Sequence, residues 1–358
     1  MNALAHQSLY DLSRDDLGEL LAGEPRYRVD QVWEGLYTHL LEPADMTTLP
    51  KALRTRLGEA LPTALEASAQ NTSADGDTVK WLWRLHDGSH VETVLMHYRD
   101  RSTVCISTQA GCAMACGFCA TGQGGFERNL TVGEFVEQVV RASRFARAQG
   151  HRVSNIVFMG MGEPFANYDR TITALERIHD ELGISARHLT VSTVGIVPGI
   201  VRFGTERLPA NLAVSLHAAN DTLRNTMVPI NRRYPLDDLM QACADYLLAK
   251  GRRLSFEWAL IDGVNDRESD ACELAALCRS LPLAAHVNLI PLNPTPGYPT
   301  RGTPLARVHQ FRDRLEALGT NATVRRNRGT DIDAACGQLA AGQPVQVVSP
   351  SRRPSTSD

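Results

Sequence analysis

The spacing of hydrophobic residues changes along the chain, and the change divides it into three parts. In SRDDLGELLAG, YRVDQVWEGLY and PKALRTRLGEAL the apolar residues recur at helical spacing, and Ser13 is a candidate N-cap. TVKWLWRLHDGSHVETVLMHY then gives two apolar runs around residues 86–89, which predicts a β-hairpin. We therefore expect a helical accessory domain over residues 1–75, a possible RNA contact, followed by a connecting hairpin.

From residue 102 onward, short apolar strands alternate with amphipathic helical stretches. Helical stretches such as LDDLMQACADYLLAKG end at glycine, where a C-cap belongs. Strands alternating with helices of this length predict parallel pairing and an α/β fold, here a partial (β/α)6 barrel. Hairpin, barrel and a C-terminal loop are expected over 76–348, and a disordered tail over 349–358. The strands are predicted at 102–108, 155–160, 189–193, 211–217, 254–261, 286–292 and 322–326.

The inward faces of these strands are polar. Strand alternation places apolar residues toward the helices, for example Phe256 and Trp258, and leaves polar residues inside. A barrel packed for stability alone would carry branched apolar residues there, so the pattern favours a ligand cavity over scattered polar residues bonded to backbone. The expected inward residues include Cys105, Ser107, Thr190, Ser192, Ser215, His217 and Glu257.

Composition narrows the class of protein. The 358 residues are 43% hydrophobic, with a net charge of -3 and eight cysteines. With no long apolar run and no export leader, we expect a cytoplasmic protein without a membrane partner. Reducing conditions leave thiols free for metal binding or chemistry. A nucleic acid would have to meet local basic patches such as 231–233 or 325–328, because the whole chain is slightly acidic.

Three cysteines stand unusually close together in GCAMACGFC, at Cys112, Cys116 and Cys119. Structural zinc takes four protein ligands, and no fourth Cys or His lies in this loop. A disulfide is disfavoured by the compartment. A four-iron cluster held by three cysteines keeps one iron open for a substrate or cofactor.

The C-x3-C-x2-C spacing, with Phe118 before the last cysteine, resembles the radical S-adenosylmethionine (SAM) superfamily. That resemblance implies one 4Fe–4S cluster on Cys112, Cys116 and Cys119, whose open iron binds SAM. The stretch FMGMGEP is a weak motif alone, because glycine-containing loops are common. After the second barrel strand it resembles the superfamily's loop for the SAM amino group, with Gly162 and Glu163 as contacts.

Six segments together extend the resemblance to the RlmN/Cfr family of radical SAM RNA methyltransferases, from about residue 92 to residue 339. The resemblance implies further SAM contacts at Ser192, Ser215, Leu216, His217 and Asn293. The segments are TVCISTQAGCAMACGFCATGQGGFERNLT, FMGMGEP, STVG, SLHAAND, NLIPLNP and RRNRGTDIDAACGQL.

The same resemblance implies a reaction at C2 of adenosine, in 23S rRNA and in tRNA beside the anticodon. C2 is too electron-poor to attack SAM, so Cys336 carries the methyl group and a radical made from a second SAM activates it. Cys105 resolves the covalent intermediate through a transient disulfide with Cys336, and Glu92 accepts the proton. For Glu92, an exposed hairpin carboxylate is the competing interpretation. An electron donor such as flavodoxin or ferredoxin is also implied.

Three alternatives stay open at this stage. The resistance branch of the family methylates C8 of the rRNA adenosine, and these motifs do not separate it from C2 methylation. A radical SAM enzyme acting on a peptide or protein would keep the cluster cysteines but would not need both Cys105 and Cys336. An iron–sulfur electron carrier would have a fourth cysteine ligand and would not cleave SAM.

Overall fold

The computed structural model describes residues 8–295, 297–298 and 300–340, so the predicted tail lies outside the described residues. The chain divides into two compact units. The first comprises Met1–Ala110, Glu127–Val191 and Arg207–Asn211, and the second comprises Gly111–Phe126, Ser192–Glu206 and Leu212–Asp358. Among the described residues, no helix is both long enough and apolar enough to cross a membrane.

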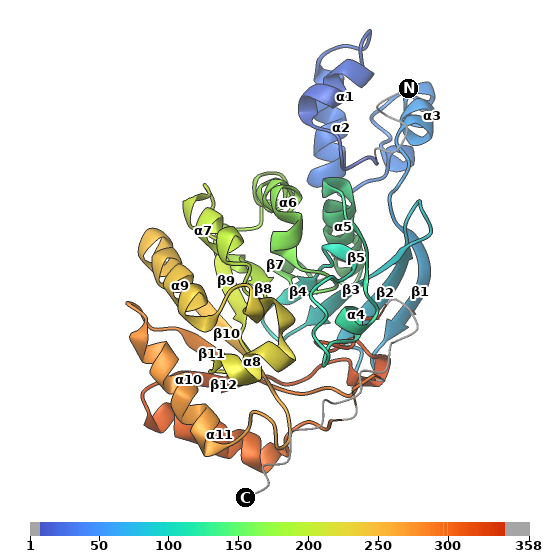
Figure 1. Ribbon diagram of the computed structural model, residues 1–358. Coiled ribbons are helices and arrows are strands. Elements are labelled where there is room, and N and C mark those ends of the chain that lie inside the picture. The colour runs from blue at the N-terminus through green and yellow to red at the C-terminus, as the bar shows by residue number, and fades with distance from the viewer. Residues whose placement is uncertain (1–7, 296, 299, 341–358) are drawn as a thin grey trace, which may run out of the picture. The chain divides into compact units, whose positions relative to one another are not determined.

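The N-terminal helices, the hairpin and the alternating strands and helices follow one another in the predicted order, with the unpredicted strands β1, β5 and β6 among them (Figure 1). The strands are β1 (Glu66–Thr72), β2 (Thr78–Arg84), β3 (His90–His97), β4 (Ser102–Cys105), β5 (Gln109–Gly111), β6 (Phe126–Asn129), β7 (Val153–Phe158), β8 (Leu189–Thr193), β9 (Asn211–Ser215), β10 (Leu254–Leu260), β11 (His286–Pro291) and β12 (Asn321–Val324). The α-helices are α1 (Arg14–Leu20), α2 (Tyr27–Tyr37), α3 (Lys51–Ala60), α4 (Ala120–Gln123), α5 (Val132–Ala148), α6 (Tyr168–Asp180), α7 (Val197–Thr205), α8 (Asp221–Met227), α9 (Leu236–Lys250), α10 (Glu268–Ser280) and α11 (Leu305–Ala317). The 3₁₀ helices are η1 (Pro43–Asp45), η2 (Pro164–Asn167), η3 (Ala186–His188), η4 (Pro229–Arg232) and η5 (Thr330–Ile332).

The first unit is built on a mixed sheet in the order β1-β2-β3-β4-β7-β8. β1 to β4 pair antiparallel in succession, and β4, β7 and β8 run parallel. The predicted hairpin is confirmed, because Thr78 pairs with Met96 and Arg84 with His90. The parallel strands β4 and β8 lie within the segments predicted at 102–108 and 189–193, and β7 overlaps the segment predicted at 155–160 but begins two residues earlier.

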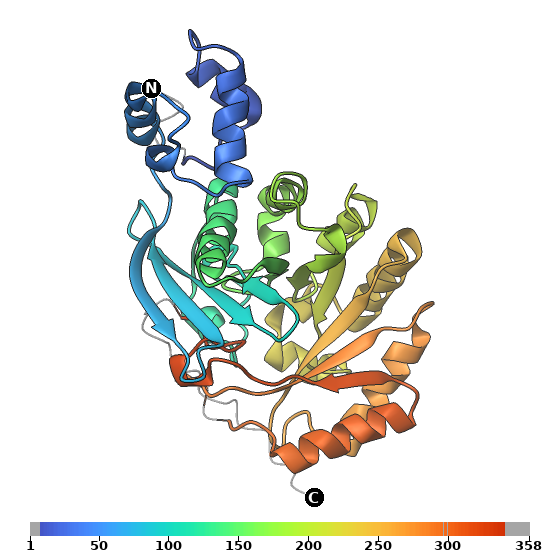
Figure 2. The same ribbon diagram turned by 180° about the vertical axis from the view of Figure 1, so that it is seen from behind.

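The segments that flank the N-terminal helices α1 and α2 are hydrogen-bonded to α5. Asp11 accepts from the Gly133 amide (2.7 Å) at the start of α5, and Arg144 Nε donates to the Leu40 carbonyl (2.5 Å) near its end. Ser13 caps α1 as predicted, in a capping box with Asp16. Figure 2 shows these helices, in dark blue, grouped at one end of the first unit. The helical part ends at α3, and β1 follows within the segment expected to be helical.

The second unit carries four parallel strands in the order β9-β10-β11-β12. Every residue of β10 is buried, and Trp258 packs on Phe311 of α11 with 6.0 Å between ring centres. α10 and α11 contact each other and lie beside β11 and β12 (Figure 1). The outward orientation predicted for Trp258 is therefore confirmed, and Glu257 points to the other face, where Asn288 donates to it (2.7 Å).

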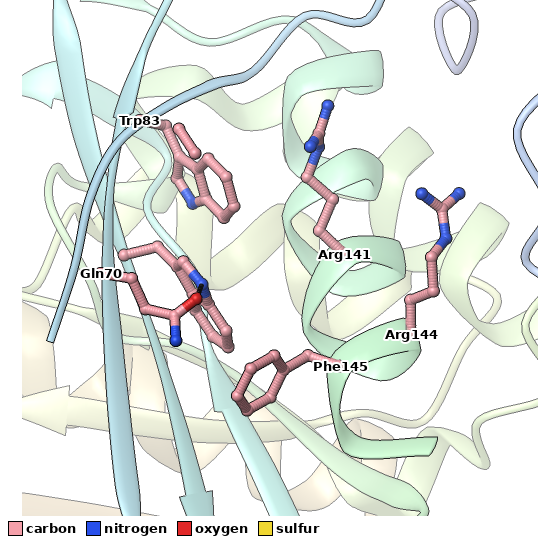
Figure 3. Close-up of a pocket in the computed structure, with 7 residues that line it drawn as sticks. Gln70, Trp83, Arg141, Arg144 and Phe145 are labelled. Atoms are coloured by element: carbon pink, nitrogen blue, oxygen red, sulfur yellow. Dashed lines mark hydrogen bonds between the residues drawn. The ribbon is translucent and has the colours of Figure 1, made fainter. Parts of the chain in front are cut away.

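A cavity of about 360 Å³ lies in the first unit between β1–β2 and α5 (Figure 3). Trp83 lies opposite Arg141, whose guanidinium stands 5.3 Å from the indole centre. Arg141 forms an ion pair with Glu137 (2.7 Å), and Arg144 forms one with Glu42 (2.6 Å). Both arginines are therefore already neutralised by carboxylates, and the cavity is not an anion-binding site. None of the candidate residues lines this cavity, and we interpret it as a packing gap.

Candidate active site

The three clustered cysteines lie on a loop that leaves the small β5–β6 sheet and enters α4. The Cys112 amide donates to the Gly125 carbonyl (2.6 Å), and the Cys119 amide donates to the Cys116 carbonyl (3.1 Å). Gly111 has φ +70°, and a side chain there would meet the Gly125 oxygen at 2.1 Å. Glycine is therefore required where the loop starts.

The inner side of this loop is packed in an apolar cluster. Cys116 and Phe118 are buried against Met227, Val228 and Ile261, and Cys119 lies at the edge of the same cluster. The loop is thus held from one side by α8 and the residues after it.

Three thiolates on eight residues are the donor type that an iron–sulfur cluster takes. In the part of the chain that the structure describes, no three Cys, His, Asp or Glu side chains form a ready metal-binding group. Ligation by Cys112, Cys116 and Cys119 therefore rests on their spacing and donor type.

His217 lies just beyond β9 in an uncommon backbone conformation, with φ +60°. Its Nδ1 accepts a hydrogen bond from the Ala259 amide (3.0 Å), and its ring meets Phe118 edge-on at 4.8 Å. Asn265 fixes the segment, since its Nδ2 donates to the His217 carbonyl (2.8 Å) and the Ala259 carbonyl (2.7 Å). Burial, with a smaller contribution from Arg224, lowers the pKa of His217 to about 3. The imidazole is therefore neutral, and its Nε2 carries the proton.

The other predicted SAM contacts of the second unit follow its strands. Ser192 and Ser215 are half-buried at the ends of β8 and β9, and Leu216 is fully buried. Asn293 follows β11 and is also buried. The predicted contacts thus stand at the carboxyl ends of parallel strands, where α/β proteins place their sites.

Cys336 lies on a C-terminal loop that is bonded to the helix after the cluster cysteines. The Ala120 amide donates to the Gly337 carbonyl (2.8 Å), and Thr121 Oγ1 donates to the Leu339 carbonyl (2.5 Å). Asn293 Nδ2 donates to the Cys336 carbonyl (3.0 Å). The structure therefore brings the predicted carrier cysteine beside the predicted cluster loop, although the sequence separates them widely.

The Cys336 side chain is exposed, yet protein atoms around it desolvate the thiolate and raise the pKa of the thiol. Arg325 lowers this pKa, whereas Glu257 and Cys119 raise it. Arg325 and Glu257 form an ion pair at 3.5 Å, so the two opposing charges beside the thiol are held together.

The first unit holds the remaining candidates: Cys105, Glu92, Gly162 and Glu163. Cys105 ends β4, is 8% exposed, and pairs with Val94 on β3. Glu92 is buried on β3 and forms an ion pair with Lys80 (3.4 Å), so the alternative of an exposed carboxylate is wrong.

The glycine-containing loop after β7, residues 159–163, is hydrogen-bonded to residues 108 and 109, which follow β4. The Thr108 amide donates to the Met161 carbonyl (2.7 Å), and Gln109 Oε1 accepts from the Glu163 amide (2.8 Å). Gly162 has φ +98°, and a Cβ there would stand 2.6 Å from Gln109. Glu163 is buried, and one carboxylate oxygen accepts from the Phe165 amide (3.0 Å). The loop thus presents a carboxylate in a fixed position.

Comparison with known proteins agrees with these features. Residues 106–275 match the Radical SAM superfamily. A probable dual-specificity RNA methyltransferase RlmN of Chloroflexus aurantiacus is 51% identical, over 96% of this chain and 95% of its own length. The chain belongs to the RlmN family. An RlmN relative from Corynebacterium diphtheriae is 48% identical over 92% of each chain.

A crystal structure supports the fold of this RlmN family member. A radical SAM methyltransferase from Sphaerobacter thermophilus superimposes with a TM-score of 0.91 at 51% identity, over 94% of this chain and 99% of that one. The predicted α/β radical SAM fold is therefore confirmed. The sequence did not indicate the buried polar residues that support the site, Asn265 above all, because asparagine in DGVND is typical of a surface turn.

Proposed function

We propose that this protein is a radical SAM methyltransferase that methylates C2 of adenosine in 23S rRNA and tRNA. The observation that carries the proposal is the pair of hydrogen bonds from Ala120 and Thr121 to the Cys336 loop. They join the loop that contains Cys336 to the helix that follows the C-x3-C-x2-C loop, in a chain of the RlmN family, and this supports a carrier role for Cys336. An electron carrier or a peptide-modifying enzyme has no need of that arrangement.

The cofactors fit the residues that would hold them. Cys112, Cys116 and Cys119 would ligate a 4Fe–4S cluster. The Glu163 carboxylate would accept hydrogen bonds from the ammonium group of SAM. The bound cluster and SAM supply a 5'-deoxyadenosyl radical, which can remove hydrogen from an S-methyl group. The remaining proposed contacts with SAM are Gly162, Ser192, Ser215, Leu216, His217 and Asn293.

The protein's own side chains perform the remaining steps. The Cys336 thiolate would attack the methyl carbon of a first SAM, forming an S–CH₃ bond as the methyl–sulfonium bond breaks and S-adenosylhomocysteine leaves, because sulfur is a strong nucleophile. Once the activated methyl carbon is bonded to adenine C2, the radical adduct would have to give up one electron, which the cluster could take back, and Glu92 would take the C2 proton. The Cys105 thiolate would then attack the Cys336 sulfur. The electron pair of the breaking carbon–sulfur bond would pass to the methylene carbon, a proton would convert that carbon to the methyl group, and a Cys105–Cys336 disulfide would remain. An electron donor such as flavodoxin or ferredoxin would supply the electrons for SAM cleavage and for reopening the disulfide. We place the reaction in the cytoplasm.

The test uses cluster-loaded protein with SAM, a reductant and each RNA, followed by mass spectrometry of nucleosides. Wild type should form 2-methyladenosine. Cys336→Ala should still cleave SAM and give no methylated base, whereas Cys272→Ala, a matched change on α10, should behave as wild type. Normal turnover of Cys336→Ala would refute the carrier role. 8-Methyladenosine from wild type would place the protein in the resistance branch.

Cys105 has its own diagnostic variant. Without the resolving thiol, the bond between Cys336 and RNA has no route to break, so Cys105→Ala should accumulate a protein–RNA adduct. Normal release of methylated RNA without an adduct would show that Cys105 is not the resolving residue.

A further inference from the structure

Arg224 is a fully buried arginine on α8 that lies under the strand ends holding the proposed SAM contacts. Its side chain has no exposed surface. Nε donates to the Leu216 carbonyl (3.0 Å), and Nη2 donates to the carbonyls of Val194 (2.7 Å) and Ser215 (3.2 Å). Nη1 donates to Asn231 Oδ1 (2.6 Å). One guanidinium therefore joins the segment after β8 to the end of β9.

Burying this cation needs compensation, because buried charges are normally paired. No carboxylate of the described residues forms an ion pair with Arg224. Its four acceptors are three backbone carbonyls and one side-chain amide oxygen, so these hydrogen bonds compensate the burial of the charge. A residue that served packing alone could be apolar at lower cost.

The bonded carbonyls belong to functional segments. Ser215 and Leu216 are proposed SAM contacts, and Val194 lies two residues after Ser192. We propose that Arg224 is a positioning residue that holds these two strand ends in the geometry that binds SAM. The inference rests on the proposed function. The guanidinium group of arginine has five N–H donors in one plane and can therefore bond to both segments. Lysine has all its donors on a single nitrogen atom and cannot reach both.

The test measures SAM affinity of cluster-loaded protein by equilibrium dialysis, together with iron content and the free energy of unfolding. Arg224→Lys should keep its iron and weaken SAM binding by about tenfold to a hundredfold, as expected when an outer support is lost. Its KM for SAM should rise more than kcat falls. SAM affinity within twofold of wild type, with only stability reduced, would overturn the inference.

Two further variants keep the test decisive. Asp270→Ala removes a buried carboxylate that caps α10 through Arg267 (2.9 Å), so it should lower stability and leave SAM affinity unchanged. An equal loss of SAM affinity in Asp270→Ala would overturn the inference. If Arg224→Lys does not fold, Asn231→Ala decides, since it frees one guanidinium nitrogen. Several-fold weaker SAM binding is then expected, and unchanged binding overturns the inference. If wild type itself fails to bind SAM, the proposed function is wrong.

Discussion

His217 should make this protein less stable in acid by an amount that can be calculated. Its folded pKa is about 3, against 6.5 for an unperturbed histidine. Because the unfolded chain binds the proton more readily, the stability present above pH 6.5 is lost as the pH falls, until the folded imidazole also titrates near pH 3. At 1.36 kcal/mol per pH unit, the loss is about 1.4 kcal/mol at pH 5.5 and about 2.7 kcal/mol at pH 4.5.

The structure gives the physical reason for this direction. Protonating Nδ1 would break the hydrogen bond from the Ala259 amide and place a positive charge in a buried site that already contains Arg224. Bulk water can solvate that charge only poorly, since His217 is only 5% exposed. The neutral imidazole is therefore part of the folded state.

The assay is denaturant unfolding of wild type and His217→Asn between pH 7 and about pH 4.5. Asparagine tolerates the left-handed backbone at this position and does not titrate. Carboxylates elsewhere affect both proteins equally, so the difference between the two pH profiles isolates the histidine. Both proteins are compared without metal, so that cluster loss does not contribute. Parallel profiles would refute the assignment of a buried neutral His217.

Two further predictions concern the glycine loop and the carrier thiol. Gly162→Ala should lower the free energy of unfolding by about 1–3 kcal/mol more than Gly88→Ala. Both glycines have positive φ, but only at Gly162 would the new Cβ clash with a neighbouring residue. Equal losses of unfolding free energy in the two variants, measured by denaturant unfolding, would contradict this reasoning. Arg325→Gln should raise the pKa of the Cys336 thiol further, and Glu257→Gln should lower it. The pH dependence of iodoacetamide labelling of Cys336, read by peptide mass spectrometry, measures both pKa shifts. If the two substitutions shifted the pKa in the same direction, the opposing effects of Arg325 and Glu257 would be refuted.

Most strands of the barrel could be predicted because they contain buried apolar residues, although β12 contains none. Apolar runs between helical stretches located β4 and β7 to β12 within a few residues. β1 could not be found in this way, since all seven of its residues are exposed and its position comes from pairing with β2. The β5–β6 pair escaped notice for a related reason. It is very short, and it depends on the close approach of Gly111 to Gly125.

Predictability of the candidate site depended on how each residue acts. Cysteines that ligate or transfer groups need fixed spacing or a characteristic segment, so Cys112 and Cys336 could be proposed from sequence. Buried residues that support the site by bonding to backbone carbonyls have no characteristic sequence motif. Arg224 and Asn265 act on backbone carbonyls up to 48 residues away, and any helix or turn can contain such residues. Their role follows from burial and bonding, which only the folded chain defines.

The contact between the Cys336 loop and α4 shows why the motif residues alone do not describe the site. Its main hydrogen bond joins two backbone groups, the Ala120 amide and the Gly337 carbonyl. Backbone bonding leaves the side chain at position 120 little role beyond its burial. Position 337 differs, because Gly337 has φ +83°, which L-residues rarely adopt. The glycine after Cys336 is thus required by the turn in which the exposed thiol lies, and the sequence ACG places the proposed carrier cysteine next to the residue that this turn requires.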